Sequence, residues 1–438
     1  MISRSKNQAY HRHSKRVELG YSIRQQSKIG FQSDQPAASQ MISVSDELPI
    51  LTFAPTGRGK GVSAIIPTLL TNDRTMIVLD PKGENYAVTA RARREMGHEV
   101  YALDPFNVAV KKSDSLNPMD LLKLPGVSIE AESYMLAESI GHDFQSKKES
   151  FWDEHAKGTI SGLIALGTID PYVANLLTLR DHLVGEDPIH KIAVALDFLT
   201  EKKLTQTMAY RELAAFMNQS ERETRPSVLA SAGAYTKIFN TDRVAKVVEK
   251  STVQLTDIIE NKPMTIYLII PTTKLNSHRA LLRLWLATTM AAIQSRKKRP
   301  KESTLFLIDE CGQLGGFELL KTAVTLSRGF GVQPWLFFQS LNQLKENYGE
   351  AWRTFIDNAG AVQAFGFANM FGGLEWGEFF GWKAKALLNL PIDNQLLYIP
   401  GEGTIESRRL NYLKDEQYRG LFDPNPYFYD NGSPGERN

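Results

Sequence analysis

The stretch Leu48 to Leu70, LPILTFAPTGRGKGVSAIIPTLL, predicts a strand, a glycine-rich loop and a helix in succession. The strand is the apolar run from Ile50 to Phe53, and the helix should begin near Gly59. A loop of this kind surrounds a polyphosphate with backbone N–H groups and the N-terminus of the helix, while Lys60 reaches the outer phosphates. The stretch therefore predicts a phosphate-binding loop within an α/β fold.

This loop departs from the usual pattern G-x-x-x-x-G-K-[ST] at two positions. Gly59 and Lys60 match it, whereas Ala54 replaces the first glycine and Gly61 replaces the hydroxyl residue that would contact Mg²⁺. A glycine-rich turn with a solvated lysine is the alternative interpretation. We expect the nucleotide-binding residues to be Pro55, Thr56, Gly57, Arg58, Gly59, Lys60, Gly61 and Val62.

Composition places the chain among ordinary globular proteins, with room for roughly two to three domains. The net charge of +2 means that affinity for nucleic acid must come from local basic patches. Cys311 is the single cysteine, which excludes an internal disulfide and a cysteine zinc site and fits a reducing cytosol. No apolar run reaches the ~18 to 20 residues that cross a bilayer, and no signal sequence is evident, so we expect a soluble chain.

The first part of the chain alternates between strand and helix signals. Residues 1–16 are basic and hold no acidic residue, so they form a solvated tail or touch DNA phosphates or an anionic membrane surface. Apolar alternation over residues 17–31 predicts one or two edge strands. A buried strand should end at Asp80, a helix should run from the sequence DPKGEN to about residue 96, and a further strand should cover residues 98–103. The helix carries three arginines that we expect on a solvated face: Arg91, Arg93 and Arg94.

Helical periodicity then dominates residues 117–225, which predicts an all-helical insertion within the sheet domain. Its helices should cover residues 131–140, 151–166 and 189–217. Helical signal continues over 226–238; a strand is expected over 264–270, a helix over 277–295, and then a solvated basic loop at 296–299. The expected divisions are a basic tail (1–16), the first part of the nucleotide-binding domain (17–116), the helical insertion (117–225), the second part of the nucleotide-binding domain (226–415) and a C-terminal tail (416–438).

A second chemical motif is the run Thr304-Leu-Phe-Leu-Ile-Asp309-Glu310. Apolar residues followed by Asp-Glu form the Walker B arrangement, in which Asp309 serves Mg²⁺ and Glu310 activates water. The next strand should cover residues 334–338 and end at Gln339. This amide either senses the γ-phosphate and orients water, or merely caps a turn.

Five motifs in order resemble the type IV secretion coupling proteins, the TraG-like ATPases of conjugation machines. They are APTGRGKGVSAIIPTLL, VLDPKGEN, FWDEHAKGTISGLI, LFLIDECGQLG and FFQSLNQLKENYG, and the resemblance covers roughly residues 48 to 381. It implies a RecA-like P-loop NTPase domain with an inserted all-α domain, assembled as a hexameric ring. It also implies ATP and Mg²⁺ as ligands, and coupling of a DNA–protein substrate to a secretion channel.

The resemblance assigns a role to each matching residue. It implies that Lys60 binds phosphate, that Asp309 and Glu310 serve Mg²⁺ and water, and that Gln339 is the sensor glutamine. Arg328 matches the arginine finger that one subunit supplies to its neighbour's site.

Three features depart from the family pattern. The transmembrane helices that usually begin family members are absent, so the chain should reach the cytoplasmic face of the inner membrane through partners. Gly61 removes the Mg²⁺-binding hydroxyl, and Cys311 and Gly312 stand where an aromatic residue and a proline are usual.

We therefore expect an ATP-hydrolysing coupling protein that recruits and drives DNA, or DNA bound to a relaxase or other protein, into a type IV secretion channel. One alternative is a soluble RecA-like DNA translocase or packaging motor. The other is a recruitment platform that binds nucleotide without hydrolysing it.

Overall fold

The computed structural model describes residues 14–23, 40–45, 48–141 and 151–427. Within these ranges the chain forms one mixed sheet of eleven strands, in the order β2-β1-β11-β10-β9-β3-β8-β7-β4-β6-β5. The strands are β1 (Val17–Ser22), β2 (Met41–Val44), β3 (Ile50–Phe53), β4 (Met76–Leu79), β5 (Glu99–Leu103), β6 (Met264–Leu268), β7 (Thr304–Ile308), β8 (Val332–Phe338), β9 (Ala361–Ala364), β10 (Asn394–Ile399) and β11 (Gly403–Arg408).

The strands from β9 to β5 in this order are parallel, while β10, β11, β1 and β2 extend the sheet in antiparallel fashion. Successive residues of the central strands face two different cores. Leu51 and Phe53 join the larger core, whereas Ile50 joins the smaller one on the other face. A parallel sheet covered on both faces explains why the sequences of β3, β4 and β7 are almost entirely apolar.

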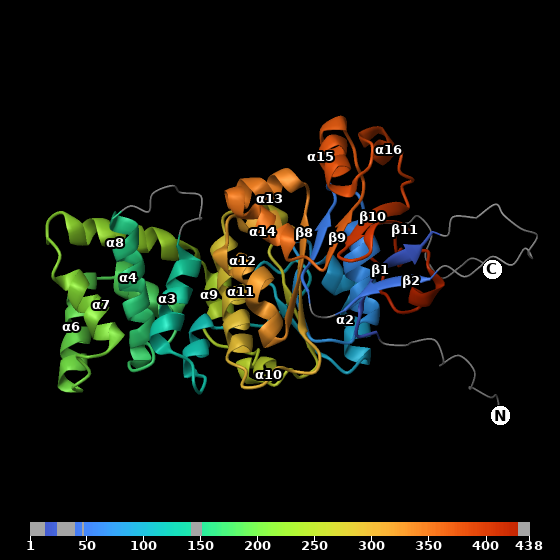
Figure 1. The fold of residues 1–438 in the computed structure, drawn as a ribbon. Helices are drawn as coiled ribbons and strands as arrows, with labels where there is room; N and C mark the ends of the chain where they lie inside the picture. Colours follow the sequence, from blue (N-terminus) through green and yellow to red (C-terminus); the bar gives the residue numbers. More distant parts are fainter. Residues whose placement is uncertain (1–13, 24–39, 46–47, 142–150, 428–438) are drawn as a thin grey trace, which may run out of the picture.

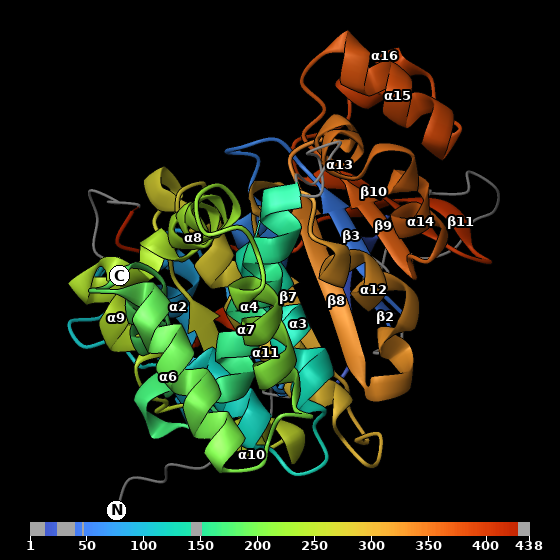
Figure 2. The same cartoon turned by 90° about the vertical axis from the view of Figure 1, so that its left-hand side faces the viewer.

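Sixteen α-helices accompany the sheet in the described ranges. They are α1 (Ile66–Thr71), α2 (Glu84–Glu95), α3 (Ile129–Ile140), α4 (Phe151–Leu166), α5 (Leu176–Val184), α6 (Pro188–Glu201), α7 (Met208–Met217), α8 (Thr224–Tyr235), α9 (Asp242–Val248), α10 (Leu255–Ile259), α11 (Arg279–Gln294), α12 (Glu318–Leu326), α13 (Leu341–Tyr348), α14 (Trp352–Asp357), α15 (Met370–Phe380) and α16 (Ala384–Leu388). Figure 1 shows α3, α4 and α6 to α8 as a helical group beside the sheet, and α15 and α16 projecting at the top of the view. In the view of Figure 2 the same helical group lies in front.

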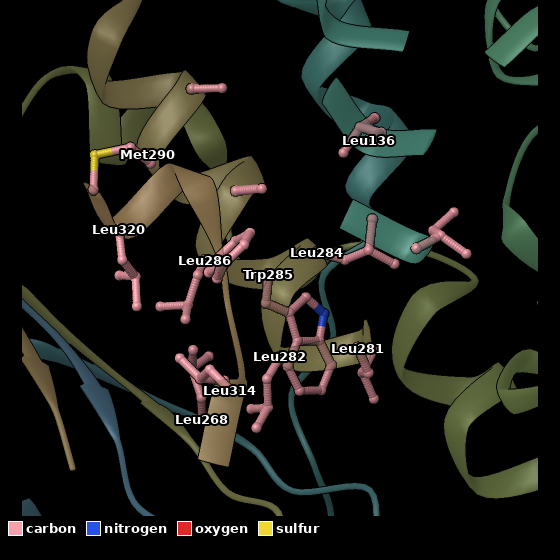
Figure 3. Close-up of a cluster of buried hydrophobic side chains, with 14 of the residues drawn as sticks. Leu136, Leu268, Leu281, Leu282, Leu284, Trp285, Leu286, Met290, Leu314 and Leu320 are labelled. Atoms are coloured by element: carbon pink, nitrogen blue, oxygen red, sulfur yellow. The ribbon is translucent and has the colours of Figure 1, made fainter. Parts of the chain in front are cut away.

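Helix α11 joins the helical group to the sheet. Every residue from 281 to 293 is buried, so the helix is covered on all sides. Figure 3 shows its Leu284 and Trp285 near Leu136 of α3, with Leu268 at the end of β6 on another side. The side chain of Arg283 interrupts this apolar run but donates to the carbonyls of Leu314 and Gly316, which gives its buried N–H groups hydrogen-bond partners. No helix among the described residues combines the length and the hydropathy needed to cross a membrane.

Most expected elements occur within a few residues of their predicted bounds. The segment 50–53 is β3, residues 151–166 are α4, and the strand before Asp80 is β4. The expected helix over 189–217 is two helices, α6 and α7, and the boundary at residue 225 falls at the start of α8. The first expected edge strand is β1. Residues 1–13 of the basic tail, and Ile29 and Phe31 of the second expected edge strand, lie outside the described residues.

The prediction that Arg93 is solvated was wrong, whereas the basic loop at 296–299 is exposed at residues 297–299 and only half-buried at Arg296. Arg93 is fully buried and donates to the carbonyls of Asn72 and Arg74 and to Thr265 Oγ1 at 2.8 Å. Arg296 begins the basic loop but donates to the carbonyls of residues 258 and 259, at 2.6 and 3.0 Å. The carbonyls of Asn72 and Ile259 lie at the C-terminal ends of α1 and α10, where a helix leaves carbonyl groups without an intrahelical partner.

Candidate nucleotide-binding site

The loop after β3 has the conformation of a phosphate-binding loop. Gly57 and Gly59 have φ angles of 76° and 88°, which residues with a side chain rarely adopt. Lys60 is 7% exposed, and its Nζ donates to the carbonyl of Ala54 at 3.3 Å. The chain then enters a π-helical turn, Gly61–Ile65, that continues into α1. The loop and the π-helical turn together direct the N-terminus of the helix toward the space beyond the C-terminal end of β3.

A cleft of about 280 Å³ lies at this point. Seven of the eight expected nucleotide-binding residues line it, together with Asp309 and Glu310. Arg58 is the exception, because it lines a neighbouring cleft of about 350 Å³ on the other side of the loop. The fold thus brings together two motifs that lie about 250 residues apart in the sequence.

Of the other residues that line the first cleft, sequence reasoning expected only Asp80 to reach the site, at the end of its buried strand. It did not assign the remaining ones: Pro81, Lys82, Glu84, Asn85 and Thr272. Most belong to the sequence DPKGEN that follows β4. The signal was present, since an apolar strand that ends in aspartate beside the Walker B strand must point that side chain to the same edge of the sheet. Tyr427 adds to the rim by donating its hydroxyl proton to the carbonyl of Lys82 at 2.7 Å.

Glu310 occupies the centre of a polar network. Its Oε1 accepts a hydrogen bond from Lys60 Nζ at 3.2 Å, and its Oε2 accepts one from Gln339 Nε2 at 2.7 Å. The backbone of Glu310 is left-handed, with φ 51° and ψ 39°, an unfavourable conformation for this residue type that often marks functional sites. The structure therefore places Gln339 against the carboxylate that sequence reasoning chose as the base.

Two carboxylates lie at the ends of the adjacent strands β4 and β7. Burial raises the pKa of Asp80 to about 7 and that of Asp309 to about 6. The negative charge of Asp309 raises the pKa of Asp80 further, while Lys60 opposes the shift at Asp309. Carboxylate oxygens suit Mg²⁺, which proteins bind through one or two carboxylates together with substrate phosphates and water. The donor set fits that ion.

The neighbouring cleft has a different character. Its apolar wall includes Val62, Phe367, Leu390 and Pro391. At its edge Arg409 donates from Nη1 to the carbonyl of Arg58 at 2.7 Å, which ties the phosphate-binding loop to the end of β11. A flat apolar ring with polar edges would fit such walls.

Arg328 does not line the first cleft. It lies exposed in a 3₁₀ turn, Ser327–Phe330, directly before β8. Gln339 follows the same strand at its other end, so roughly 23 Å of strand separates the two positions at about 3.3 Å per residue. The arginine is therefore outside the cleft of its own chain.

Solved structures share this fold. The plasmid coupling protein TrwB, in complex with the GTP analogue GDPNP, has a TM-score of 0.68 at 14% identity and covers 93% of this chain and 97% of that one. TrwB with ADP and Mg²⁺ has a TM-score of 0.66 at 15% identity, with the same two coverages. This likeness confirms the predicted α/β fold.

Sequence relatives point to the same group. "Conjugal transfer protein TraG" of Rhizobium radiobacter is 28% identical over 306 residues, which are 68% of this chain and 46% of that protein. "Protein VirD4" of Rhizobium rhizogenes is 28% identical over 324 residues, or 72% and 46%. The matched region thus spans about half the length of these relatives.

A family model described as "Type IV secretory system Conjugative DNA transfer" matches residues 27–370. That range is more than half of the chain and contains both the phosphate-binding loop and the Asp309-Glu310 motif. The chain belongs to the type IV secretory system conjugative DNA transfer family.

Proposed function

We propose that this chain binds and hydrolyses ATP with Mg²⁺ and uses that energy to move DNA, or a DNA–protein complex, into a type IV secretion channel. The observation that carries the proposal is the meeting of the phosphate-binding loop, Asp309 and Glu310 in one cleft, with Gln339 bonded to Glu310. Membership of the conjugative DNA transfer family supplies the substrate class.

The phosphates of ATP would lie over the start of the helix at Gly61. Backbone N–H groups of the loop and the ammonium of Lys60 would hold them. Lys60 is paired with Glu310 in this structure, so binding requires the ammonium to exchange a carboxylate for phosphate oxygens. The adenine ring of ATP would lie in the neighbouring cleft, against Phe367 and Leu390, because that cleft adjoins the other side of the phosphate-binding loop.

Glu310, once released from Lys60, would take a proton from water as that water's oxygen forms a bond to the γ-phosphorus. The bond between the γ-phosphorus and the β,γ-bridging oxygen then breaks, and ADP leaves with that oxygen. Gln339 would orient the water, and the contact of its amide with Glu310 at 2.7 Å supports this role. Asp309 would hold Mg²⁺, which neutralises charge on the phosphates when it is bound.

Arg328 would act on the site of a neighbouring subunit in a homo-hexameric ring. A ring joins unlike faces of successive subunits, so one subunit's nucleotide edge meets a different face of the next. Arg328 is exposed at the opposite end of β8 from the nucleotide cleft, which suits such a role.

Catalysis in trans is tested by mixing Arg328→Ala with Lys60→Ala subunits. Recovery of turnover is expected on mixing, and none in demonstrably mixed rings would contradict it.

The partners follow from the relatives' names and from the family. We propose that a DNA-bound relaxase or another protein substrate is delivered with the DNA, and that secretion-channel components bring the chain to the cytoplasmic face of the inner membrane.

Nucleotide binding itself is tested by titrating wild-type and Lys60→Ala protein with a fluorescent ATP analogue and Mg²⁺. Weaker binding is expected in the variant, and equal affinity would contradict the phosphate role of Lys60.

A further inference from the structure

The loop that follows the Walker B motif, Glu310–Gly315, lies against helix α13. Gln343 of α13 accepts a hydrogen bond at its Oε1 from the backbone N–H of Gln339, at 2.9 Å. One turn later, Asn347 donates from Nδ2 to the carbonyl of Gly312, also at 2.9 Å. The helix therefore holds both the residue that contacts Glu310 and the loop that begins with Glu310.

The contact between Gln343 and this loop is unusually close. A Cβ atom added to Gly312 would lie 2.0 Å from Gln343 Cδ and 2.2 Å from its Nε2. Real Cβ atoms essentially never approach heavy atoms within 3.0 Å. The side chain of Gln343 thus lies directly over Gly312, and a side chain at residue 312 would force the end of Gln343 to move.

Local helix capping does not account for this arrangement. Ser340 is the N-cap of α13 and accepts a hydrogen bond from the N–H of Gln343 at 3.2 Å. In a capping box the third residue of the helix would return a bond to the N–H of the cap itself. Gln343 instead bonds the N–H of Gln339, one residue earlier, whose side chain contacts Glu310.

We propose that Gln343 is a positioning residue for ATP hydrolysis. It fixes the backbone of Gln339 and the loop at Gly312 together, so that the amide of Gln339 and the carboxylate of Glu310 keep their mutual geometry. Gln343 does not line the nucleotide cleft and acts through these two residues. This inference rests on the proposed hydrolytic function.

The first test replaces Gln343 by methionine, which keeps the length of the side chain but cannot accept the hydrogen bond of Gln339. Displacements of about 1 Å at a reacting geometry cost about a hundredfold, so kcat should fall between about tenfold and a hundredfold. The Kd for an ATP analogue and the melting temperature should remain near wild-type values. Asn342→Ala is the matched control, because that neighbouring side chain is exposed and donates to Glu346 of the same helix.

A second test exploits the close contact. Gly312→Ala alone should lower kcat, because the new methyl group must displace Gln343. In a Gln343→Ala background the three atoms closest to the new methyl group, all from the Gln343 side chain, are gone, so adding it should change kcat less than it does in wild type. Additive losses in the double variant would overturn the proposal.

The outcomes separate this inference from the function on which it rests. Normal kcat in Gln343→Met, beside a Lys60→Ala protein without turnover, would overturn the positioning role alone. A loss of kcat that only follows a loss of folded protein would overturn it as well. Wild-type protein without any turnover, or full turnover in Lys60→Ala, would overturn the proposed hydrolytic function first.

Discussion

Replacement of Glu310 by glutamine should separate nucleotide binding from hydrolysis. The change preserves the size of the side chain but removes its negative charge and its capacity to take a proton. In the structure this carboxylate accepts hydrogen bonds from both Lys60 and Gln339. We expect turnover to fall and affinity for ATP to rise.

The magnitudes follow from the two roles of the carboxylate. General-base catalysis contributes about 10² to 10⁴ in rate, so turnover should fall by that factor. The ion pair with Lys60 is nearly buried, since the side chains of Lys60 and Glu310 are 8% and 17% exposed. A hydrogen bond to a charged group contributes about 1.5 to 3 kcal/mol, and ATP must displace it from Lys60. Its loss should tighten ATP binding by about tenfold or more.

Two measurements check this pair of expectations. Single-turnover hydrolysis gives the rate of the chemical step, and titration with a fluorescent ATP analogue in Mg²⁺ gives the affinity. Glu318→Gln is the matched control, because that carboxylate is 52% exposed and pairs with Lys321 on α12. Turnover within about threefold of wild type would show that the base lies elsewhere. Weaker ATP binding would contradict the competition between Glu310 and phosphate for Lys60.

Further predictions concern stability and DNA binding. Gly162→Ala should lower the free energy of unfolding by about 1 to 3 kcal/mol, because the added carbon would lie 2.8 Å from Glu212 Cβ. Gly329→Ala is the control and should leave that free energy unchanged, because the carbon added there has no atom within 4 Å. Burial and the charge of Arg93 lower the pKa of His98 to about 4, so the folded state favours the neutral ring. The contribution of His98 to the free energy of unfolding is therefore fully present above the unfolded pKa near 6.5, and it is lost as the pH falls toward 4. Denaturation at pH 7 and pH 5 should show a smaller loss in His98→Gln than in wild type, and an equal loss would contradict this. Affinity for DNA should fall steeply with added salt without strong sequence preference, whereas salt-insensitive binding would argue against phosphate contacts.

Local chemistry explains which parts of the site could be predicted from sequence. The phosphate-binding loop, Asp309 and Glu310 follow buried strands, and apolar runs of this kind are visible without any knowledge of tertiary contacts. The positions of Lys60 and Gln339 against Glu310 follow from strand order, because β8 lies between β3 and β7. Motif order was enough to place them in one site.

The remainder depends on contacts between distant segments. Arg93 looked like a surface residue because its sequence neighbours are polar, yet its partners are the carbonyls of Asn72 and Arg74, about twenty residues earlier. The antiparallel extension that begins at β10 pairs the end of the chain with β1, which no local pattern indicates. The contact of Gln343 with Gly312 likewise became visible only once α13 was placed against the Walker B loop.

The central claim is that this site hydrolyses ATP in the service of DNA movement. Its most direct test is the steady-state ATPase rate of purified protein in Mg²⁺, with and without DNA, beside Lys60→Ala at equal concentration. We predict Mg²⁺-dependent hydrolysis that DNA stimulates and that Lys60→Ala abolishes without loss of fold. Wild-type protein that binds ATP but shows no hydrolysis with DNA, or a Lys60→Ala protein that hydrolyses ATP at the wild-type rate, would contradict the account.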